Sequence, residues 1–367
     1  MRSDYNTNNT KAFLALVRAG LWEKEVRLSI IESIALKEIY RLAQEQSVVG
    51  LVAAGLEQVK EVQFPKEDVL TIVGDALQLE QRNMAMNDFI GDIVEKMRKV
   101  GIYTILVKGQ GVAQCYAKPQ WRACGDVDLL LSPENYDRAK HFLAPLALSI
   151  DEEDVRRKHI GMTIEPWIVE LHGALPFGLS LRTDKLLDDA YNDVFYKGNV
   201  RSWMNGNTQV FLPTPDNDVI FVFTHFLHHF FIEGVGLRQI CDWCRILWSF
   251  RDSIDIPLLE NRIRKAGLMT EWRTFAAVAV DYLGMPSESM PLYRHGYQKR
   301  AQRVLSCILK GGNFGQNKDL SYRTKYKGLT YKIIAVWRRF VDFSSLMLVF
   351  PVDVPRFFFT YVFEKIK

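Results

Sequence analysis

Apolar residues recur every three or four positions through most of the first hundred residues, which is the spacing of one face of an α-helix. The pattern predicts helices around 13–21, 34–42, 48–59 and 68–100, and Pro65 marks a break before the last of them. The residues that we expect on the buried stripe of that last helix are Leu77, Leu79, Met84, Met86, Phe89, Ile90, Ile93, Val94 and Met97.

The pattern changes at residue 101. A β-branched apolar run at 102–107 predicts a buried strand, a turn follows at 108–111, and a helix is expected from Val112. Residues 126–131 form a second expected strand, and Ser132 and Pro133 are typical of the cap and first position of the helix after it. A third strand is expected at 164–171. Short strands that alternate with helices in this way indicate an α/β or α+β core.

The remainder of the chain returns to helical spacing. We expect helices at 216–231, 237–250, 256–284 and 290–310, and a glycine-rich loop at 311–315. A chain of 367 residues has room for two or three structural units. We therefore predict an N-terminal helical region (1–100), a core (101–213) and a C-terminal helical domain (214–367) that ends in a basic, aromatic tail.

Charge is concentrated in that tail. The formal net charge of the whole chain is +4, which is too mild to indicate nucleic-acid binding by itself. Residues 320–367, however, hold nine Lys or Arg and three acids, interleaved with Trp, Tyr and Phe. The simpler interpretation is a helical layer that closes the C-terminal domain with a basic outer face. The alternative is a peripheral contact of 320–367 with an anionic membrane surface.

The cysteines and the N-terminal segment indicate the cellular compartment of the protein. Five scattered cysteines favour a reducing environment, and Cys241 and Cys244, three apart in an apolar helix, are typical of packing because no second pair completes a zinc site. The polar N-terminal segment predicts no secretory leader, and no apolar run is long enough for a membrane span. We expect a cytoplasmic protein, with a peripheral position at the inner membrane as the alternative.

The chemistry of the core starts from Asp126 and Asp128. Side chains two apart on a strand share a face, and two carboxylates a few ångströms apart repel each other unless a cation neutralises them. Gly125 before them allows close approach of another group, and the three leucines after them anchor the strand. Hard oxygen ligands of this kind suit Mg²⁺ or Mn²⁺. The pair by itself is equally compatible with a solvated strand end.

Two further features have the same double interpretation. The turn Lys108-Gly109-Gln110-Gly111 directly follows a strand, so its backbone N–H groups and the Lys108 charge suit a phosphate, although no Walker motif is present. Glu170 is an isolated acid in the apolar run of the third strand. It is either a residue of the exposed face or a third carboxylate beside the aspartate pair.

Taken together, the order of strand, glycine turn, helix, Asp-x-Asp strand and later acid resembles the DNA polymerase beta-type nucleotidyltransferase superfamily. The longer pattern is similar to a bacterial family of uncharacterised nucleotidyltransferases. It comprises Leu106 to Gly109, Tyr116, Pro119, Arg122 and Gly125 to Leu130, and extends to His225, Arg238, Asp242 and 311–315. The block from Lys108 to Asp128 is the specific part, and the helical matches are weaker.

The resemblance implies an α+β fold, with a small mixed β-sheet nucleotidyltransferase core flanked by N-terminal and C-terminal helical regions. It implies that Asp126, Asp128 and Glu170 are catalytic and bind metal. It further implies that the nucleoside triphosphate contacts Lys108, Gly109, Gln110, Arg122 and Gly125. The serine that the superfamily often has in its glycine turn is absent here, so Lys108, Gly109 or Gln110 would take its place.

Several charged or titratable positions have open roles. Arg122 either reaches the phosphates or pairs with an acid. His225 and His229 have a spacing that can bind zinc, but packing between helices is the simpler interpretation because no third ligand is evident. Arg238 and Asp242 either pair within one helix or, with His225, line the cleft.

The function that we expect is metal-dependent transfer of a nucleoside monophosphate from a triphosphate to an acceptor hydroxyl, with Mg²⁺ or Mn²⁺. The mild net charge favours a small-molecule acceptor over a long nucleic acid. Two other classes stay open: a nucleotide-binding or partner-binding module with little turnover, and an antitoxin-like regulatory partner.

Overall fold

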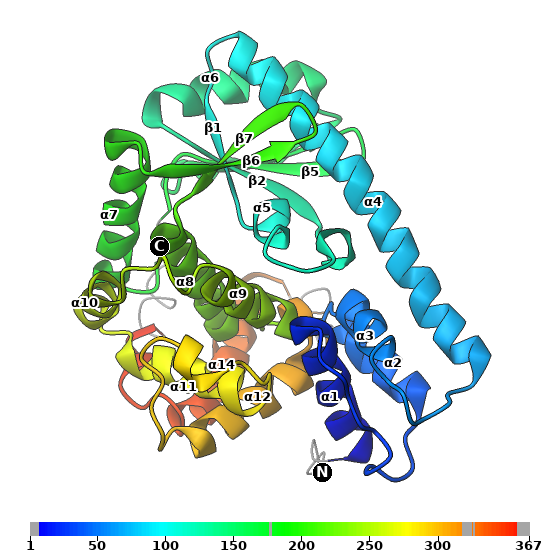
Figure 1. The fold of residues 1–367 in the computed structure, drawn as a ribbon. Helices are drawn as coiled ribbons and strands as arrows, with labels where there is room; N and C mark the ends of the chain where they lie inside the picture. Colours follow the sequence, from blue (N-terminus) through cyan, green and yellow to red (C-terminus); the bar gives the residue numbers. More distant parts are fainter. Residues whose placement is uncertain (1–6, 176–177, 318–324, 326, 358–367) are drawn as a thin grey trace.

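The computed structural model describes residues 7–175, 178–317, 325 and 327–357 (Figure 1). Parts of the predicted tail, 320–324, 326 and 358–367, lie outside these residues. The chain begins with helices, continues into a seven-stranded sheet and ends in a second group of helices. This arrangement confirms the α+β prediction, while the domain boundaries at 100 and 213 stay a prediction.

The N-terminal helices are α1 (Asn8–Trp22), α2 (Leu36–Glu45), α3 (Val49–Leu56) and the 34-residue α4 (Lys66–Lys99). Small residues let α3 pack closely against its surroundings: a Cβ on Gly50 would lie 1.9 Å from the carbonyl oxygen of Trp121. The predicted buried stripe of α4 is wrong at Leu77 and Met84, which are exposed. Only the second half of α4 covers the sheet. The predicted residues there are buried as expected: Met86, Phe89, Ile90, Ile93, Val94 and Met97.

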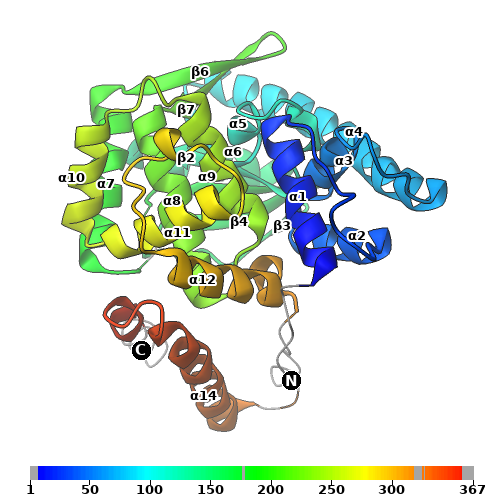
Figure 2. The same cartoon turned by 60° about the horizontal axis from the view of Figure 1, so that its bottom comes forward.

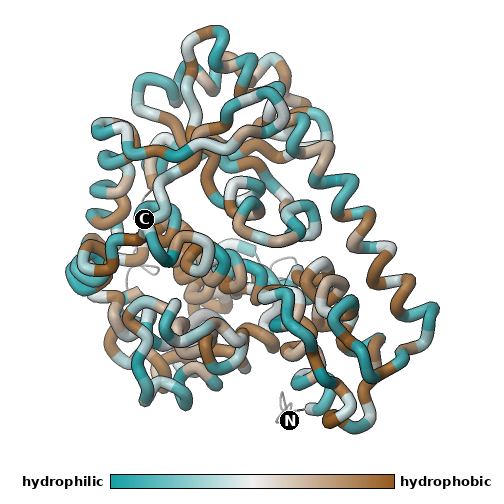
Figure 3. The backbone as a smooth tube through the Cα atoms, in the orientation of Figure 1, coloured by the Kyte–Doolittle hydropathy of each residue, from teal (hydrophilic) through white to brown (hydrophobic). Residues whose placement is uncertain are grey.

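The sheet has the order β3-β4-β5-β2-β1-β7-β6. Its strands are β1 (Thr104–Val107), β2 (Asp126–Leu131), β3 (Ser149–Ile150), β4 (His159–Ile164), β5 (Trp167–His172), β6 (Val200–Asn205) and β7 (Thr208–Pro213). The pairs β2/β5 and β1/β7 are parallel and the others antiparallel, so the sheet is mixed. Figure 3 shows hydrophobic residues gathered along its central strands.

The prediction of a third strand at 164–171 is wrong in its bounds. Ile164 ends β4 and pairs with Trp167, the first residue of β5, so the chain turns at Glu165 and Pro166 rather than running straight through. Glu165 has a φ of 53°, which a tight hairpin turn needs. The helix predicted from Val112 also begins earlier, because α5 is Gly109–Ala113.

The two faces of the sheet have different covers. Leu129 and Leu131 of β2 lie in a core with the second half of α4 and with α6 (Pro133–Leu143), whose cap at Ser132 is as predicted. Leu130 points the other way, into the large core shared with α7 (Leu181–Lys197), α8 (Pro215–Ile232) and α9 (Leu237–Ser249). Because Asp126 and Asp128 alternate with the α4-facing residues, they lie on the α8 and α9 side.

The C-terminal helices continue with α10 (Ile256–Ala266), α11 (Met269–Asp281), α12 (Gln298–Gly311) and α14 (Gly328–Met347). The single helix predicted at 256–284 is therefore two, separated at Gly267, whose φ of 74° ends α10. The predicted loop at 311–315 packs on the turn before α9, where a Cβ on Gly234 would lie 2.8 Å from the amide nitrogen of Gly315. No helix among the described residues is long and apolar enough to span a membrane.

Helix α14 lies apart from the sheet, below α12 in Figure 2. Its C-terminal half packs on the helical core: Phe343 is buried and stacks on Phe231 of α8, with ring centroids 6.5 Å apart. Phe350 and Phe357 contact the same phenylalanine. This part of the tail is the closing layer that the simpler interpretation predicts.

Candidate active site

The two aspartates of β2 begin the strand at its open end. Asp126 is partly exposed, whereas the side chain of Asp128 is only 2% exposed. The leucine two residues further, Leu130, continues the same face into the core with no exposure. The acids are therefore held on a rigid strand whose inner end is fixed by packing, as the sequence predicts.

Strand register places a third carboxylate beside them. In the parallel pair β2/β5, Asp128 is opposite Glu170, and Asp126 is opposite Ile168. Glu170 thus shares the face of both aspartates, on the neighbouring strand. The three acids that the sequence marks as metal ligands therefore lie on one face of two neighbouring strands.

Lys108 lies among these carboxylates. Its Nζ is 2.6 Å from Oδ1 of Asp128, and its side chain is 16% exposed. The residue precedes α5 with φ 57° and ψ −143°, a region that non-glycine residues rarely adopt and that costs about 1–3 kcal/mol. The fold accepts this strain in the turn that directs the ammonium group onto the acids.

Two histidines complete the cluster, and the sequence analysis assigned neither of them. His172 follows Glu170 by two residues on β5, and its Nε2 lies 2.8 Å from Oδ1 of Asp128. His159 is opposite His172 in the β4/β5 pair, and its Nε2 lies 3.3 Å from Oε2 of Glu170. The alternation Glu-Leu-His in a strand was a signal for His172, but nothing in the sequence predicts the register that adds His159.

The electrostatics follow from this crowding. Repulsion by Asp128, with burial, raises the pKa of Asp126. Burial would also raise the pKa of Asp128, but Lys108 and His172 outweigh it and lower that pKa. The pKa of Glu170 is likewise lowered, because its hydrogen bonds with His159 and His172 and the charge of Lys108 outweigh burial.

The cations respond in the opposite sense. Burial disfavours the charged form of His172, but its contacts with Asp128 and Glu170 prevail and raise its pKa. The carboxylates similarly raise the pKa of Lys108 against the effect of burial. The contacts with Lys108 and His172 therefore favour the ionised forms of Asp128 and Glu170, whereas repulsion disfavours that of Asp126.

The glycine turn contributes mostly through its backbone. Gly109 has a φ of 42°, and a Cβ there would lie 3.3 Å from Sγ of Cys124. A Cβ on Gly125 would meet no atom within 4 Å, so the space beside it is open. The side chain of Gln110, in contrast, is buried and its Nε2 donates to Oδ1 of Asn83 at 2.9 Å. The side chain of Gln110 is therefore held by α4 and does not line the open space beside Gly125.

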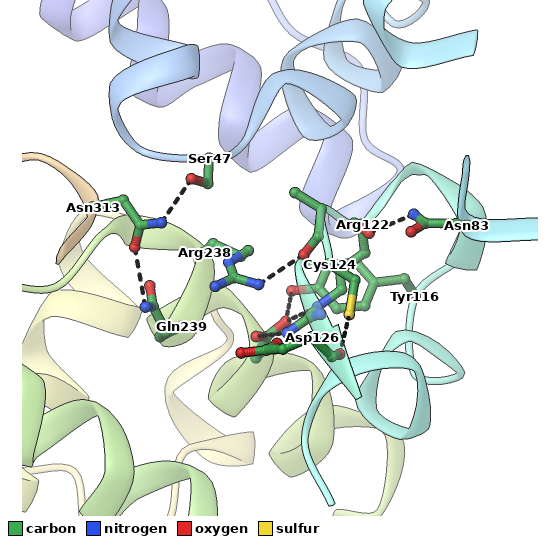
Figure 4. A network of polar contacts seen from close by, with 11 residues as sticks. Ser47, Asn83, Tyr116, Arg122, Cys124, Asp126, Arg238, Gln239 and Asn313 are labelled. Carbon is green, nitrogen blue, oxygen red and sulfur yellow. Dashed lines mark hydrogen bonds and ion pairs between the residues drawn. The ribbon is translucent and has the colours of Figure 1, made fainter. Parts of the chain in front are cut away.

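Arg122 pairs with an acid of the later helices rather than with Asp126 or Asp128. Its Nη2 and Nε lie 2.6 Å and 3.0 Å from the two carboxylate oxygens of Asp242, and both side chains are 5% exposed (Figure 4). Tyr116 also donates to Asp242, at 2.7 Å. The predicted pair within α9 is therefore wrong: Arg238 donates to the carbonyl of Ala123 at 2.8 Å instead.

Two pockets adjoin the site. One, with a cavity volume of about 60 Å³, lies between α1, α3 and the segment 116–123, and Arg122 and Arg238 contribute to its lining. The other is smaller, about 10 Å³, and its lining includes Lys108, His172 and His225. His225 therefore lies beside the carboxylate cluster, and burial together with the Lys108 charge lowers its pKa well below the ordinary value.

The histidine pair of α8 makes ring contacts. The rings of His225 and His229 meet edge to face, with centroids 4.5 Å apart. Among the described residues, the only group of three or more potential metal ligands is His159, Glu170 and His172, so no third ligand joins the α8 pair.

A family model described as "Uncharacterised nucleotidyltransferase" matches residues 32–284. The chain belongs to this nucleotidyltransferase family. Searches of curated proteins and of solved structures gave no match. The matched range contains Lys108, the three carboxylates and both helices α8 and α9, whereas the 311–315 loop lies beyond it.

Membership of a nucleotidyltransferase family gives the cluster its chemical context. Such an enzyme is a transferase that moves a nucleoside monophosphate group. The carboxylates share one face of β2 and β5, beside the turn that carries Lys108, and the space next to Gly125 is open. This part of the described chain brings together acids and a cation, which are the group types that phosphoryl chemistry uses.

Proposed function

We propose that this transferase moves a nucleoside monophosphate from a nucleoside triphosphate to an acceptor hydroxyl in a reaction that depends on Mg²⁺ or Mn²⁺. The placement of Asp126, Asp128 and Glu170 on one face of the parallel strands β2 and β5 carries the proposal. We also propose that the core belongs to the DNA polymerase beta-type superfamily, on the strength of this strand arrangement.

The donor set fits divalent metal. Three carboxylates share one face of the sheet, and Asp128 raises the pKa of Asp126 by repulsion, which a divalent cation would relieve. When bound, the metal would stabilise charge on the phosphates and lower the pKa of the acceptor hydroxyl. Asp126 and Asp128 would hold the metal on the triphosphate side. Glu170 would hold it on the acceptor side and accept the hydroxyl proton.

Other residues would hold the triphosphate. We expect the backbone N–H groups at Gly109 and Gln110, together with the Lys108 ammonium, to contact its phosphates. Gly125 leaves room for a phosphate to approach the strand. Arg122 supports this segment through Asp242, so we assign it mainly to positioning the 122–125 segment.

The acceptor is proposed to be a small molecule. The pocket that Arg238 lines, between α1, α3 and the 116–123 segment, is the place that we propose for it. The net charge of +4 gives no strong field for a long nucleic acid. His225 and Arg238 are the cleft residues placed to contact the acceptor or the base.

Pyrophosphate release tests this proposal. Purified protein with Mg²⁺ or Mn²⁺, the four ribonucleoside triphosphates and a pool of small hydroxyl compounds should release pyrophosphate and label an acceptor. Glu170→Gln should abolish release while triphosphate binding, measured by calorimetry, persists. Tight triphosphate binding without any release by the native protein would instead favour a binding module.

Replacing Lys108 separates its charge from its strained backbone. Lys108→Met and Lys108→Gly both remove the ammonium group, so we expect both to raise the KM for the triphosphate by about tenfold or more, equivalent to about 1.4 kcal/mol. Glycine relieves the strain at φ 57° whereas methionine keeps it. Urea unfolding should therefore find Lys108→Gly more stable than Lys108→Met by about 1–3 kcal/mol. Unchanged KM values in both variants would exclude a triphosphate role for Lys108.

A further inference from the structure

At the edge of the carboxylate cluster, two imidazole nitrogens and a carboxylate oxygen lie close together. His159, Glu170 and His172 each offer one ligand atom, and these atoms lie within 4.8 Å of one another. Both imidazole Nε2 atoms approach the same oxygen, Oε2 of Glu170, at 3.3 Å and 3.5 Å. Atoms bound to one zinc ion at 2.0–2.2 Å in a tetrahedron are separated by about 3.3–3.5 Å. The spacing is that of ligands to a common ion.

The strands hold this set in place. His159 is opposite His172, and Gly161 is opposite Glu170, so the three ligands share one face of the β4/β5 pair. Gly161 provides no side chain over Glu170. The carboxylate of Asp151 occupies that space instead, since a Cβ on Gly161 would lie 2.4 Å from Oδ2 of Asp151. Rigid strands and a further nearby oxygen are what a preformed metal site needs.

We propose that His159, Glu170 and His172 bind one divalent transition-metal ion of borderline softness, such as Zn²⁺, Co²⁺ or Mn²⁺. Imidazole nitrogen suits these ions, whereas Mg²⁺ takes oxygen ligands. The site shares Glu170 with the proposed catalytic centre. Its existence does not depend on nucleotide transfer, and it gives the acceptor side of the centre a different metal preference from the Asp126 side.

Metal titration without nucleotide tests the site. Isothermal calorimetry with Zn²⁺ and visible spectroscopy with Co²⁺ should each find one ion per chain. His159→Gln and His172→Gln should each weaken binding by at least about tenfold, since loss of even an outer partner of a ligand typically costs 10- to 100-fold. His141→Gln is the matched control, because His141 is an exposed histidine on α6 that contacts only the carbonyl of Asp137 among its hydrogen bonds in the described chain. It should bind as the native protein does.

Several results would overturn the site. They are no stoichiometric binding of either ion, native affinity in both His159→Gln and His172→Gln, and a cobalt–thiolate band that places the ion on a cysteine. Asp126→Asn separates this inference from the proposed function: it should lose transfer activity and keep the Co²⁺ spectrum. If the native protein shows no transfer but binds Co²⁺ as described, the metal site stands and the proposed reaction fails.

A second observation, independent of the first, concerns the solvent face of α14. Ile333, Trp337 and Val341 follow one another at intervals of four, so they lie on one side of the helix, and Leu348 falls on the same side just after its end. Their exposed fractions are 60%, 64%, 49% and 70%. The opposite side packs on the core through Phe343 and Leu346. An exposed apolar stripe of this length on a helix indicates a surface that meets a partner.

The charge balance of the two helices selects the partner. The sequence of α14 holds three basic residues and one acid, and the whole segment 320–367 holds nine and three. Helix α4 has a comparable exposed stripe at Leu70, Leu77 and Met84, but it holds five basic and seven acidic residues. We infer that α14 lies in the interface of an anionic lipid bilayer, with Trp337 at the level of the headgroups and the net positive charge of the segment attracted by the anionic lipids.

Vesicle sedimentation with the full chain tests this surface. Binding should be measurable on vesicles with 30% phosphatidylglycerol in phosphatidylcholine and weak on phosphatidylcholine alone. The double variant Ile333→Ser, Trp337→Ser should partition at least about tenfold less, because two apolar side chains are lost from the interface. Leu77→Ser, Met84→Ser on α4 is the matched control and should bind as the native protein does. No binding to anionic vesicles, or a dimer in solution that the α14 variant disrupts, would overturn the lipid assignment.

Discussion

Replacing Asp128 by asparagine is expected to reduce the rate of nucleotidyl transfer by at least about a thousandfold. Loss of one preorganised group that stabilises transition-state charge typically costs a factor of 100 to 1000. Asp128 lies between Asp126 on its own strand and Glu170 on the neighbouring strand. Its loss therefore removes the carboxylate that connects the other two. The measurement is pyrophosphate release at saturating triphosphate, with Mg²⁺ and with Mn²⁺.

The fold of Asp128→Asn should survive. Asparagine keeps an oxygen that accepts hydrogen bonds from Lys108 and His172, and the lost charge relieves repulsion on Asp126. We expect the free energy of unfolding to change by no more than about 1.5 kcal/mol, a typical net contribution of one hydrogen bond. Asp137→Asn, an exposed aspartate on α6, is the control and should keep native activity. Native turnover by folded Asp128→Asn would refute the role of this carboxylate.

Breaking the buried pair between Arg122 and Asp242 should have the largest effect on stability. Asp242→Leu leaves a guanidinium that is 5% exposed without its carboxylate, which typically costs about 3–5 kcal/mol. Urea unfolding followed by circular dichroism measures this loss. Glu57→Gln, which breaks the exposed pair with Lys118, is the matched control and should cost less than about 1 kcal/mol.

The double variant Arg122→Met, Asp242→Leu distinguishes pairing from a direct catalytic role. If Arg122 acts by holding the 122–125 segment, the double variant should recover at least half of the stability lost in Asp242→Leu, because no buried charge is left alone. A small stability loss in Asp242→Leu, with a large loss of activity, would place Asp242 in direct contact with substrate instead.

Local signals were sufficient for the strand at the centre of the site. The alternating acids followed by leucines predict β2, and the serine cap with its proline predicts the start of α6; the structure has both at the expected residues. The edge hairpin β6/β7 was missed because its strands are mostly half-exposed and lack a continuous apolar run. Leu77 and Met84 were misplaced because the pattern of α4 does not indicate where its neighbours end.

Tertiary contacts account for the parts of the site that the sequence could not provide. Arg122 and Asp242 are 120 residues apart, and only the packing of α9 against segment 116–123 brings them together. His159 joins Glu170 through the β4/β5 register, which depends on a turn that the sequence pattern did not reveal. Gln110 stands in a glycine turn typical of phosphate binding, yet its side chain is sequestered by Asn83 of α4.

A crystal structure with Mn²⁺ and a non-hydrolysable triphosphate tests the central claim most directly, because manganese scatters anomalously. The account predicts manganese peaks in contact with Asp126 and Asp128, with Glu170 on the side away from the triphosphate. The triphosphate itself should lie against the backbone of Gly109 and the Lys108 ammonium. A nucleotide bound elsewhere, or manganese that avoids both aspartates, would contradict it.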